Sequence, residues 1–483
     1  MKRNDTSIRV NSIANAILTM SGFVFPLITF PYVSRVLHPI GVGRVAFASS
    51  VVSYFLSFSQ LGIPTYGIRI CAKLRDDKRA LSKTVHELFL ISFFMASITF
   101  AILICLIITV PRFRSDRVLL LISGSSVMLS AFGMEWLYKG LEKYTYIAIR
   151  SIGFKVIAII SMFAFVRSES DCIKYAAISV IAASGSYILN FINSKSIILY
   201  EYFGNYELKK HFKGIGVFFA MTCAAMIYTH LDIVMLGFLK NDLDVGYYNA
   251  AVKIKTILVS IVTSISAVVL PRVSYYIEHG SLDEFRRMAN RTLRFVVFAA
   301  IPMVVYFTLF AEEGILFLSG SAYEPSIAPM QVIMPTVLCI GITNIFGIQM
   351  LVPMGKERYV LYSEIIGAVI DLLLNSVFIP RYGALGAAIG TLVAEIAVLL
   401  YQVYAIRDEL VFLSKGMGIL RYGLYAVVAA LGCLWVKLIG MNDFFTLLLS
   451  GGIFFGVYLL CAFVSKDEMV KVVFARVRVI DKA

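Results

Sequence analysis

The feature that most constrains this chain is a series of apolar runs, each about twenty residues long, separated by short polar segments. A membrane-spanning α-helix needs roughly 20 apolar residues, whereas a spanning β-strand needs only about ten. The runs therefore predict helices rather than strands. The fourteen predicted spans are 11–34, 45–66, 87–110, 118–138, 147–166, 175–198, 214–238, 247–270, 295–318, 328–353, 360–380, 384–406, 420–439 and 444–464.

The composition excludes a water-soluble fold. Apolar residues make up 59% of the 483 residues and charged residues only 15%, against about 45–50% and about 25% in soluble globular domains. Most of the seven cysteines lie inside the apolar runs, where a thiol behaves as a small apolar group. We therefore expect an all-α integral membrane protein.

The sequence contains none of the motifs that would indicate catalysis. It has no Gly-x4-Gly-Lys-[Ser/Thr] loop for nucleotide phosphates, no His/Cys spacing typical of a metal site and no recognisable Ser-His-Asp constellation. It also lacks a large outer loop with paired carboxylates, which argues against a membrane glycosyltransferase or polymerase. We expect a protein that is not an enzyme and that needs neither a cofactor nor a metal.

The net charge of +14 is explained by membrane topology. With the N-terminus inside, 31 of the 44 Lys and Arg residues fall in inner segments and ten in outer segments, as the positive-inside rule requires. This asymmetry predicts a multi-pass protein of the cytoplasmic membrane with both termini cytoplasmic. The basic tail, 466–482, is expected to lie on the anionic inner leaflet. The charge excess gives no indication of nucleic-acid binding.

Two short echoes indicate an internal repeat. The pattern Gly-x-Glu-[Lys/Arg]-Tyr starts at Gly140 and again at Gly355, and the pair Val42-Gly43 returns as Val245-Gly246. We infer two six-helix lobes in the same orientation, related by an axis along the membrane normal, as in some transporters. The predicted division is an N-lobe at 1–210, a C-lobe at 211–410, and two further helices with a cytoplasmic tail at 411–483.

Several charged residues lie inside the predicted spans, where each costs about 2.5–3.5 kcal/mol to insert. They are Lys155, Asp232, Lys253, Lys255, Glu364, Asp371 and Glu395. Glu364, Ala368, Asp371 and Asn375 fall on one helix face, which predicts that this face points at protein or water. Lys155 occupies a similar depth in the other lobe. Two interpretations stay open: these charges pair across the lobes, or the cations bind an anionic substrate and the carboxylates bind a coupling ion.

Further basic residues are candidates for contact with an anion. Arg35 and Arg44 flank the first outer turn, where an arginine can bind phosphate in a bidentate way or simply reach the membrane interface. Lys253 is favoured over Lys255, because the two lie roughly 200° apart around the helix and only one can face a cavity squarely. The predicted substrate-binding residues are Arg35, Arg44, Arg69, Arg150, Lys155, Lys253 and Lys255. The predicted ion-coupling or gating residues are Asp232, Glu364, Asp371, Asn375 and Glu395.

An ordered set of short motifs runs through most of the chain. It comprises Phe30-Pro31-Tyr32-Val33-Ser34-Arg35, Gly62-Ile63-Pro64-Thr65-Tyr66-Gly67-Ile68-Arg69, Glu135-Trp136, Asp232-Ile233-Val234-Met235-Leu236-Gly237, Val245-Gly246-Tyr247-Tyr248-Asn249, Leu270-Pro271-Arg272, Asn344, Gly347-x-Gln349, Asn375 and Pro380-x2-Gly383-x2-Gly386. With this set the chain resembles the polysaccharide repeat-unit flippases, the O-antigen and capsule exporters. Their superfamily also holds multidrug extruders and lipid II flippases.

The resemblance implies translocation of an undecaprenyl-pyrophosphate-linked oligosaccharide between leaflets by alternating access. It also implies a cationic cavity and coupling to a gradient of H⁺ or Na⁺ without ATP. A polysaccharide polymerase and glycosyltransferases are the implied protein partners. Three alternatives stay open: a drug/cation antiporter of the same fold, a flippase for lipid II or teichoic-acid precursors, and a non-transporting scaffold of a glycan assembly complex.

Overall fold

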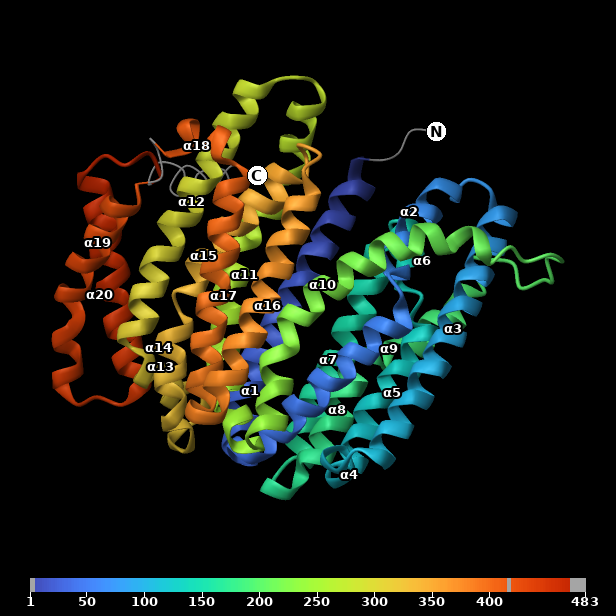
Figure 1. Ribbon diagram of the computed structural model, residues 1–483, viewed down its shortest axis with the longest axis horizontal. Helices are drawn as coiled ribbons and strands as arrows, with labels where there is room; N and C mark the ends of the chain where they lie inside the picture. Colours follow the sequence, from blue (N-terminus) through green and yellow to red (C-terminus); the bar gives the residue numbers. More distant parts are fainter. Residues whose placement is uncertain (1–4, 415–417, 470–483) are drawn as a thin grey trace. The chain divides into compact units, whose positions relative to one another are not determined.

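The computed structural model describes residues 5–414 and 418–469, and every regular element in these ranges is a helix (Figure 1). The predicted all-helical membrane fold is confirmed. Its physical reason is that hydrocarbon offers no hydrogen bonds to the backbone, so each spanning segment must satisfy its own N–H and C=O groups. Large apolar side chains accordingly cover the outer faces of the helices, including Phe94 at 65% and Ile160 at 63% exposed.

The chain forms two compact units, residues 1–246 and 247–483. The helices that lie in the first unit are α1 (Asp5–Gln60), α2 (Ile63–Leu74), α3 (Lys78–Thr109), α4 (Pro111–Ser115), α5 (Arg117–Gly133), α6 (Glu135–Gly140), α7 (Tyr144–Phe165), η1 (Glu169–Asp171), α8 (Cys172–Ser184), α9 (Ser186–Ser194) and α10 (Lys209–Leu239). The predicted three-part division of the chain stays a prediction.

The second unit takes in most of α11 (Asp242–Glu278), whose first turn belongs to the first unit. Its other helices are α12 (Leu282–Leu309), α13 (Ala311–Ser319), η2 (Ser321–Ser326), α14 (Ile327–Ile333), α15 (Thr336–Asn344), η3 (Ile345–Leu351), α16 (Glu357–Tyr382), α17 (Ala384–Ala405), α18 (Arg407–Ser414), α19 (Ile419–Cys433), η4 (Leu434–Ile439) and α20 (Asp443–Val464).

The predicted count of fourteen spans is not confirmed. Within the described ranges, eleven helices are long and apolar enough to cross a membrane, or twelve if the bent pair Ser321–Ile333 and Thr336–Leu351 is one span. That pair bends by 44° next to Pro335, which cannot continue the helical hydrogen bonding. Two other predicted spans are united in the stretch Met20–Leu74, and α10 contributes only the short apolar helix Thr229–Leu239.

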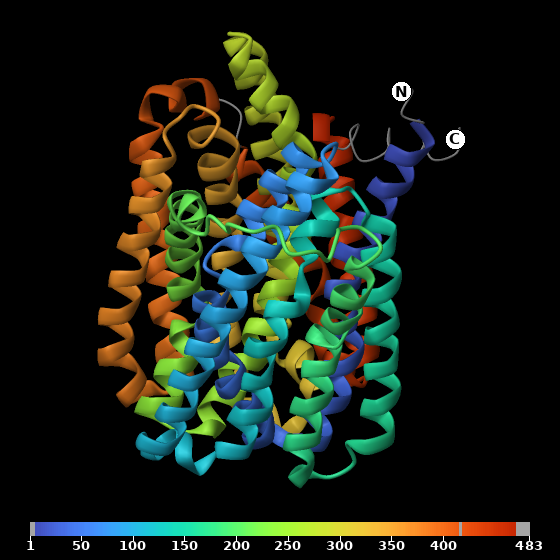
Figure 2. The same cartoon turned by 90° about the vertical axis from the view of Figure 1, so that its right-hand side faces the viewer.

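α1 reverses direction in its middle. His38 has non-helical backbone angles (φ 56°, ψ 175°), and Pro39 follows it. Figure 1 shows the dark-blue first half of α1 meeting its second half at this turn, and Figure 2 shows the same reversal from the side. The turn falls between the first two predicted spans, 11–34 and 45–66, so the sequence pattern located it although the helix is continuous in assignment.

Four turns that were predicted to lie outside the membrane gather at one end of the first unit. Arg44 after the α1 turn donates from Nε to Asp116 at 2.8 Å, and its Nη1 lies 3.6 Å from Cys172 Sγ at the start of α8. Arg112 of α4 forms an ion pair with Asp242 at the start of α11. The predicted alternation of turns is therefore confirmed in this unit.

The segments predicted to lie inside gather at its opposite end. His211 Nε2 lies 2.8 Å from a carboxylate oxygen of Glu87, and the Tyr66 hydroxyl lies 2.9 Å from His211 Nδ1. Arg75 lies 3.9 Å from Glu142. These contacts join α2, α3 and α10 with the turn that precedes α7. That this end is cytoplasmic stays a prediction.

The repeat echo of Val42-Gly43 and Val245-Gly246 forms a reciprocal contact. A Cβ atom on Gly43 would lie 1.8 Å from the carbonyl oxygen of Asp242, and one on Gly246 would lie 2.0 Å from the carbonyl oxygen of Pro39. Each glycine thus packs on the carbonyl four residues before the other glycine. The α1 turn and the first turn of α11 can approach this closely only because both positions lack a side chain.

Candidate functional site

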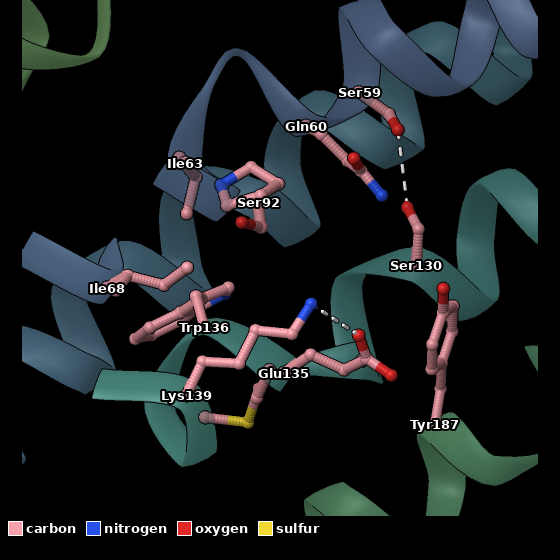
Figure 3. A pocket seen from close by; sticks show the side chains of 13 residues that line it. Ser59, Gln60, Ile63, Ile68, Ser92, Ser130, Glu135, Trp136, Lys139 and Tyr187 are labelled. Atoms are coloured by element: carbon pink, nitrogen blue, oxygen red, sulfur yellow. Dashed lines mark hydrogen bonds and ion pairs between the residues drawn. The ribbon is translucent and has the colours of Figure 1, made fainter. Parts of the chain in front are cut away.

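A cavity of about 170 Å³ lies in the first unit, where two helices are interrupted (Figure 3). The first interruption separates α1 from α2 at Leu61 and Gly62, both in the left-handed region (φ 47° and 76°). The second separates α5 from α6 at Met134 (φ 44°). Non-helical backbone at membrane depth is tolerated where it is buried in protein or lines a cavity. Both breaks meet this requirement, because residues beside each of them line the same cavity.

The cavity is lined by both polar and apolar side chains. The lining residues are Ser59, Gln60, Ile63, Pro64, Ile68, Ser92, Ser130, Gly133, Met134, Glu135, Trp136, Lys139 and Tyr187. Figure 3 shows the Gln60 amide and the Lys139 ammonium pointing toward the same space. The hydroxyls of Ser59 and Ser130 lie 3.3 Å apart and join the end of α1 to α5.

Glu135 is the centre of a charged chain beside this cavity. Lys139 Nζ lies 3.3 Å from one of its oxygens, and Arg150 donates to the other at 2.8 Å. Arg150 also donates to the Ser186 carbonyl at 3.2 Å, and its side chain is only 4% exposed. Arg150, a predicted substrate-binding residue, is therefore held by α6 and α9. Arg150 and Lys139 therefore share the one carboxylate of Glu135.

Lys155, the other predicted cation of this region, contacts a hydroxyl. Its Nζ donates to Ser21 Oγ at 2.9 Å and so links α7 to the first half of α1. The Lys155 side chain is half-buried. A hydroxyl does not neutralise an ammonium, so this contact leaves Lys155 able to attract an anion. Its predicted role in binding a substrate stays untested.

The three remaining basic candidates of the first unit have different surroundings. Arg35 is exposed and donates to the Pro31 carbonyl at 2.7 Å. Arg69 is exposed on α2, next to the cavity residue Ile68. Arg44 forms an ion pair with Asp116, so it stabilises the contact between two of the outer turns.

The outer turns contain an ion-pair network that sequence reasoning did not find. Asp116, with a side chain only 4% exposed, accepts from Arg44 and, at 3.0 Å, from Arg112. Arg112 also pairs with Asp242 and lies 4.5 Å above the Phe47 ring. Asp116 and Asp242 were counted only as outer charges, because residues 126 positions apart carry no mark of contact in a single sequence.

In the second unit, the face of α16 that includes Asp371 and Asn375 is buried against α17. Asp371 is 1% exposed and Asn375 is fully buried. A Cβ atom on Gly390 would lie 2.2 Å from Asn375 Oδ1 and 3.2 Å from Asp371 Oδ1, so the α17 glycine makes room for both polar groups. The prediction that this polar face points at protein is confirmed for these two residues. Glu364 is only half-buried.

The other predicted charged residues lie on three helices. Glu395 is buried on α17 and Asp232 is buried on α10. Lys253 and Lys255 are both half-buried on α11, so burial does not separate them. Near Glu395, the Tyr248 and Thr391 hydroxyls lie 2.8 Å apart and are buried. The roles predicted for these charged residues stay predictions.

A second buried carboxylate, Glu87, was also missed. It is fully buried on α3 and accepts from His211, from Lys210 at 2.9 Å and from the Glu207 backbone amide at 2.8 Å. These contacts fix the start of α10. The predicted span began at Glu87, so the sequence pattern treated this residue as a helix boundary rather than as an interior acid.

Comparison with known proteins covers both units. Residues 8–276, more than half of the chain, match the family model described as "Polysaccharide biosynthesis protein", and residues 218–377 match the model MatE. A protein of Escherichia coli (strain K12) named "Putative O-antigen transporter" is 24% identical over 416 residues, which cover 85% of this chain and 99% of that protein.

Two solved structures show the same fold. A lipid II flippase MurJ in an inward closed conformation aligns with a TM-score of 0.72 at 18% identity, covering 95% of this chain and 99% of that one. An inward-facing multidrug resistance MATE family transporter of the MOP superfamily aligns with a TM-score of 0.65 at 12% identity, covering 83% and 98%.

Proposed function

The chain belongs to the polysaccharide biosynthesis protein family, and on that premise we propose that it is a flippase for lipid-linked oligosaccharide repeat units. The substrate is an undecaprenyl-pyrophosphate-linked glycan that moves from the inner to the outer leaflet of the cytoplasmic membrane. The relatives named as O-antigen transporters and flippases support this substrate class. Both termini are cytoplasmic in this proposal, as the Lys and Arg distribution favours.

The observation that carries the proposal is the charge retained inside membrane helices of this family member. Lys155 on α7 donates to the Ser21 hydroxyl, and Asp371 lies buried on α16. Charges at such depth persist where they serve a transported ion or substrate. Lys155 and Lys253 bind the diphosphate in this scheme, and Asp371, Asn375 and Glu395 bind the coupling H⁺ or Na⁺.

The decisive experiment follows the lipid-linked glycan by leaflet in cells that lack the native gene and carry Lys155→Ala, Lys253→Ala or Asp371→Asn. We expect each variant to lower glycan export at least about tenfold, since each removes one charge-assisted contact of roughly 1.5–3 kcal/mol. The exposed Ile160 on α7 provides a matched control, because Ile160→Ala changes only a lipid-facing side chain.

The same cells separate this function from its rivals. If the chain were a drug/cation antiporter, the substitutions would change drug susceptibility and glycan export would stay normal. A scaffold would tolerate all three substitutions, so normal export by all three expressed variants would reject the charged mechanism. A polymerase or glycosyltransferase partner would be recovered by cross-linking in the wild-type strain.

A further inference from the structure

The size of the cavity in the first unit limits what it can hold. Its volume is about 170 Å³, whereas pockets for drug-sized ligands run from about 300 to 1,000 Å³. A volume of this size matches a single ring with its substituents better than a whole oligosaccharide or a typical extruded drug.

The lining itself carries one carboxylate and one ammonium. Among the described residues these are Glu135 and Lys139, which form an ion pair at 3.3 Å, and Arg150 behind the lining pairs with the same carboxylate at 2.8 Å. A diphosphate would meet the Glu135 carboxylate, and a cationic drug would meet the Lys139 ammonium. Each would also have to displace the existing partner. The lining therefore favours a ligand that is polar but uncharged.

The hydrogen-bonding groups of the lining suit hydroxyls. A hydroxyl both donates and accepts, so a ring with several hydroxyls needs donors and acceptors side by side. Glu135 accepts only, Lys139 donates only, and the Gln60 amide does both; Ser92 and Tyr187 add two more hydroxyls on the lining. Figure 3 shows these groups arriving from separate helices around one space.

Trp136 supplies an apolar aromatic surface to the same space. Its indole lies against Gly67, where a Cβ atom would be 2.7 Å from ring carbons Cδ2 and Cε3. The glycine thus sets the position of the ring, and the ring lines the cavity. An aromatic plane beside hydrogen-bonding groups matches a sugar, which has an apolar C–H face and a polar edge.

We propose that this cavity, enclosed by the α1–α2 and α5–α6 breaks, binds one neutral sugar ring of the lipid-linked glycan. The proposal rests on the flippase function above and divides the substrate between two places. The sugar ring enters this cavity, while the diphosphate is bound by the cations proposed above, Lys155 and Lys253. The cavity thereby selects glycans by one of their sugars.

The chain contains its own reporter for this binding. It has only two tryptophans, and Trp435 lies in η4 of the second unit. In a Trp435→Phe protein purified in nanodiscs, all tryptophan emission comes from Trp136. A panel of free neutral hexoses and N-acetylhexosamines is titrated, with sugar-free undecaprenyl diphosphate as the charged probe. We expect at least one sugar to change the emission saturably at millimolar concentration, because a ligand of about a dozen heavy atoms binds weakly.

Two variants test whether the lining groups make the contact. Lys139→Met leaves Glu135 paired with Arg150, and Gln60→Leu removes an amide of similar size. Each is expected to weaken sugar affinity about tenfold. Trp136→Phe with Trp435 retained must abolish the response. A flat Trp136 emission across the panel, or a response to undecaprenyl diphosphate alone, overturns the proposal.

Failure of this site and failure of the flippase function give different results. If the Trp435→Phe protein moves glycan between leaflets but no sugar affects Trp136, the function stands and the sugar cavity is wrong. If sugars bind at Trp136 but glycan stays in the inner leaflet, the cavity stands and the proposed function is wrong.

Discussion

Gly43 and Gly246 occupy positions where the backbone of another segment leaves no space for a side chain. Their virtual Cβ atoms would overlap the carbonyl groups of Asp242 and Pro39, which cannot rotate away as a side chain would. Sequence reasoning detected the two glycines as an echo but could not know that the two copies touch. A local sequence echo can only predict a repeat, whereas the contact between the two glycine segments is a property of the fold.

The first prediction concerns these two glycines. Gly43→Ala and Gly246→Ala are each expected to destabilise the protein by about 1–3 kcal/mol or more, since the added methyl group must push backbone aside. The melting temperature in detergent measures the effect. Gly153→Ala on α7 is the control, because nothing lies within 4 Å of its virtual Cβ. Equal melting temperatures for all three variants would contradict the close contact.

Arg44 shows the limit of prediction at the scale of one residue. Its place beside the first outer turn was located from sequence, but its partner Asp116 lies 72 positions away. A charge pattern predicts the position of an arginine relative to the membrane. The carboxylate that it contacts is determined by the fold. Lys155 differs, because its depth inside an apolar run already singled it out.

At the scale of elements, the apolar runs located helices well and helix interruptions poorly. The breaks at Leu61–Gly62 and at Met134 need only one or two left-handed residues, which leave the hydropathy of the run unchanged. The proline at position 335 is a sequence signal for a bend, whereas no residue type at Met134 predicts a break. Yet these breaks form the walls of the cavity. The sequence therefore predicted the spans and several charged candidates, but not the cavity that two breaks make together.

The second prediction concerns the docking of α10 on α3. Glu87→Gln keeps an acceptor for His211 but removes the charge that Lys210 contacts. We expect amide exchange at residues 205–212 to accelerate about tenfold, because the free energy of local opening falls by roughly that of one charge-assisted hydrogen bond. Hydrogen–deuterium exchange with mass spectrometry measures this.

Glu207→Gln is the matched control for that experiment. The Glu207 side chain is 65% exposed and lies 3.7 Å from Lys210, so its loss should leave exchange nearly unchanged. If both substitutions accelerate exchange equally, the buried network is not what fixes the start of α10.

For the whole molecule, the charge distribution and the contacts of the first unit agree. The contacts place the turns near Asp116 and Cys172 at one end and those near Glu87 and Glu142 at the other. The Lys and Arg excess predicts that the second end is cytoplasmic. The helix count was less predictable, because the bend at Pro335 and the short apolar helix Thr229–Leu239 change the number of spans without changing the composition.

The third prediction tests this orientation with single cysteines in a cysteine-free protein. In intact cells, Ser170→Cys is expected to react with a membrane-impermeant thiol reagent, and Asp76→Cys is expected to react only after permeabilisation. Both native side chains lie on exposed surface outside the helices or at their ends. The reverse labelling pattern would invert the proposed topology.

The reciprocal glycine contact has a mechanical consequence. Because Gly43 and Gly246 meet carbonyls of the main chain, backbone atoms make this contact and no side-chain rotamer of either glycine is involved. The neighbouring ion pairs Arg44–Asp116 and Arg112–Asp242 hold the segments around this contact in place. Because the Asp116 side chain is only 4% exposed, salt screens its ion pairs weakly, so this contact is expected to persist as ionic strength rises.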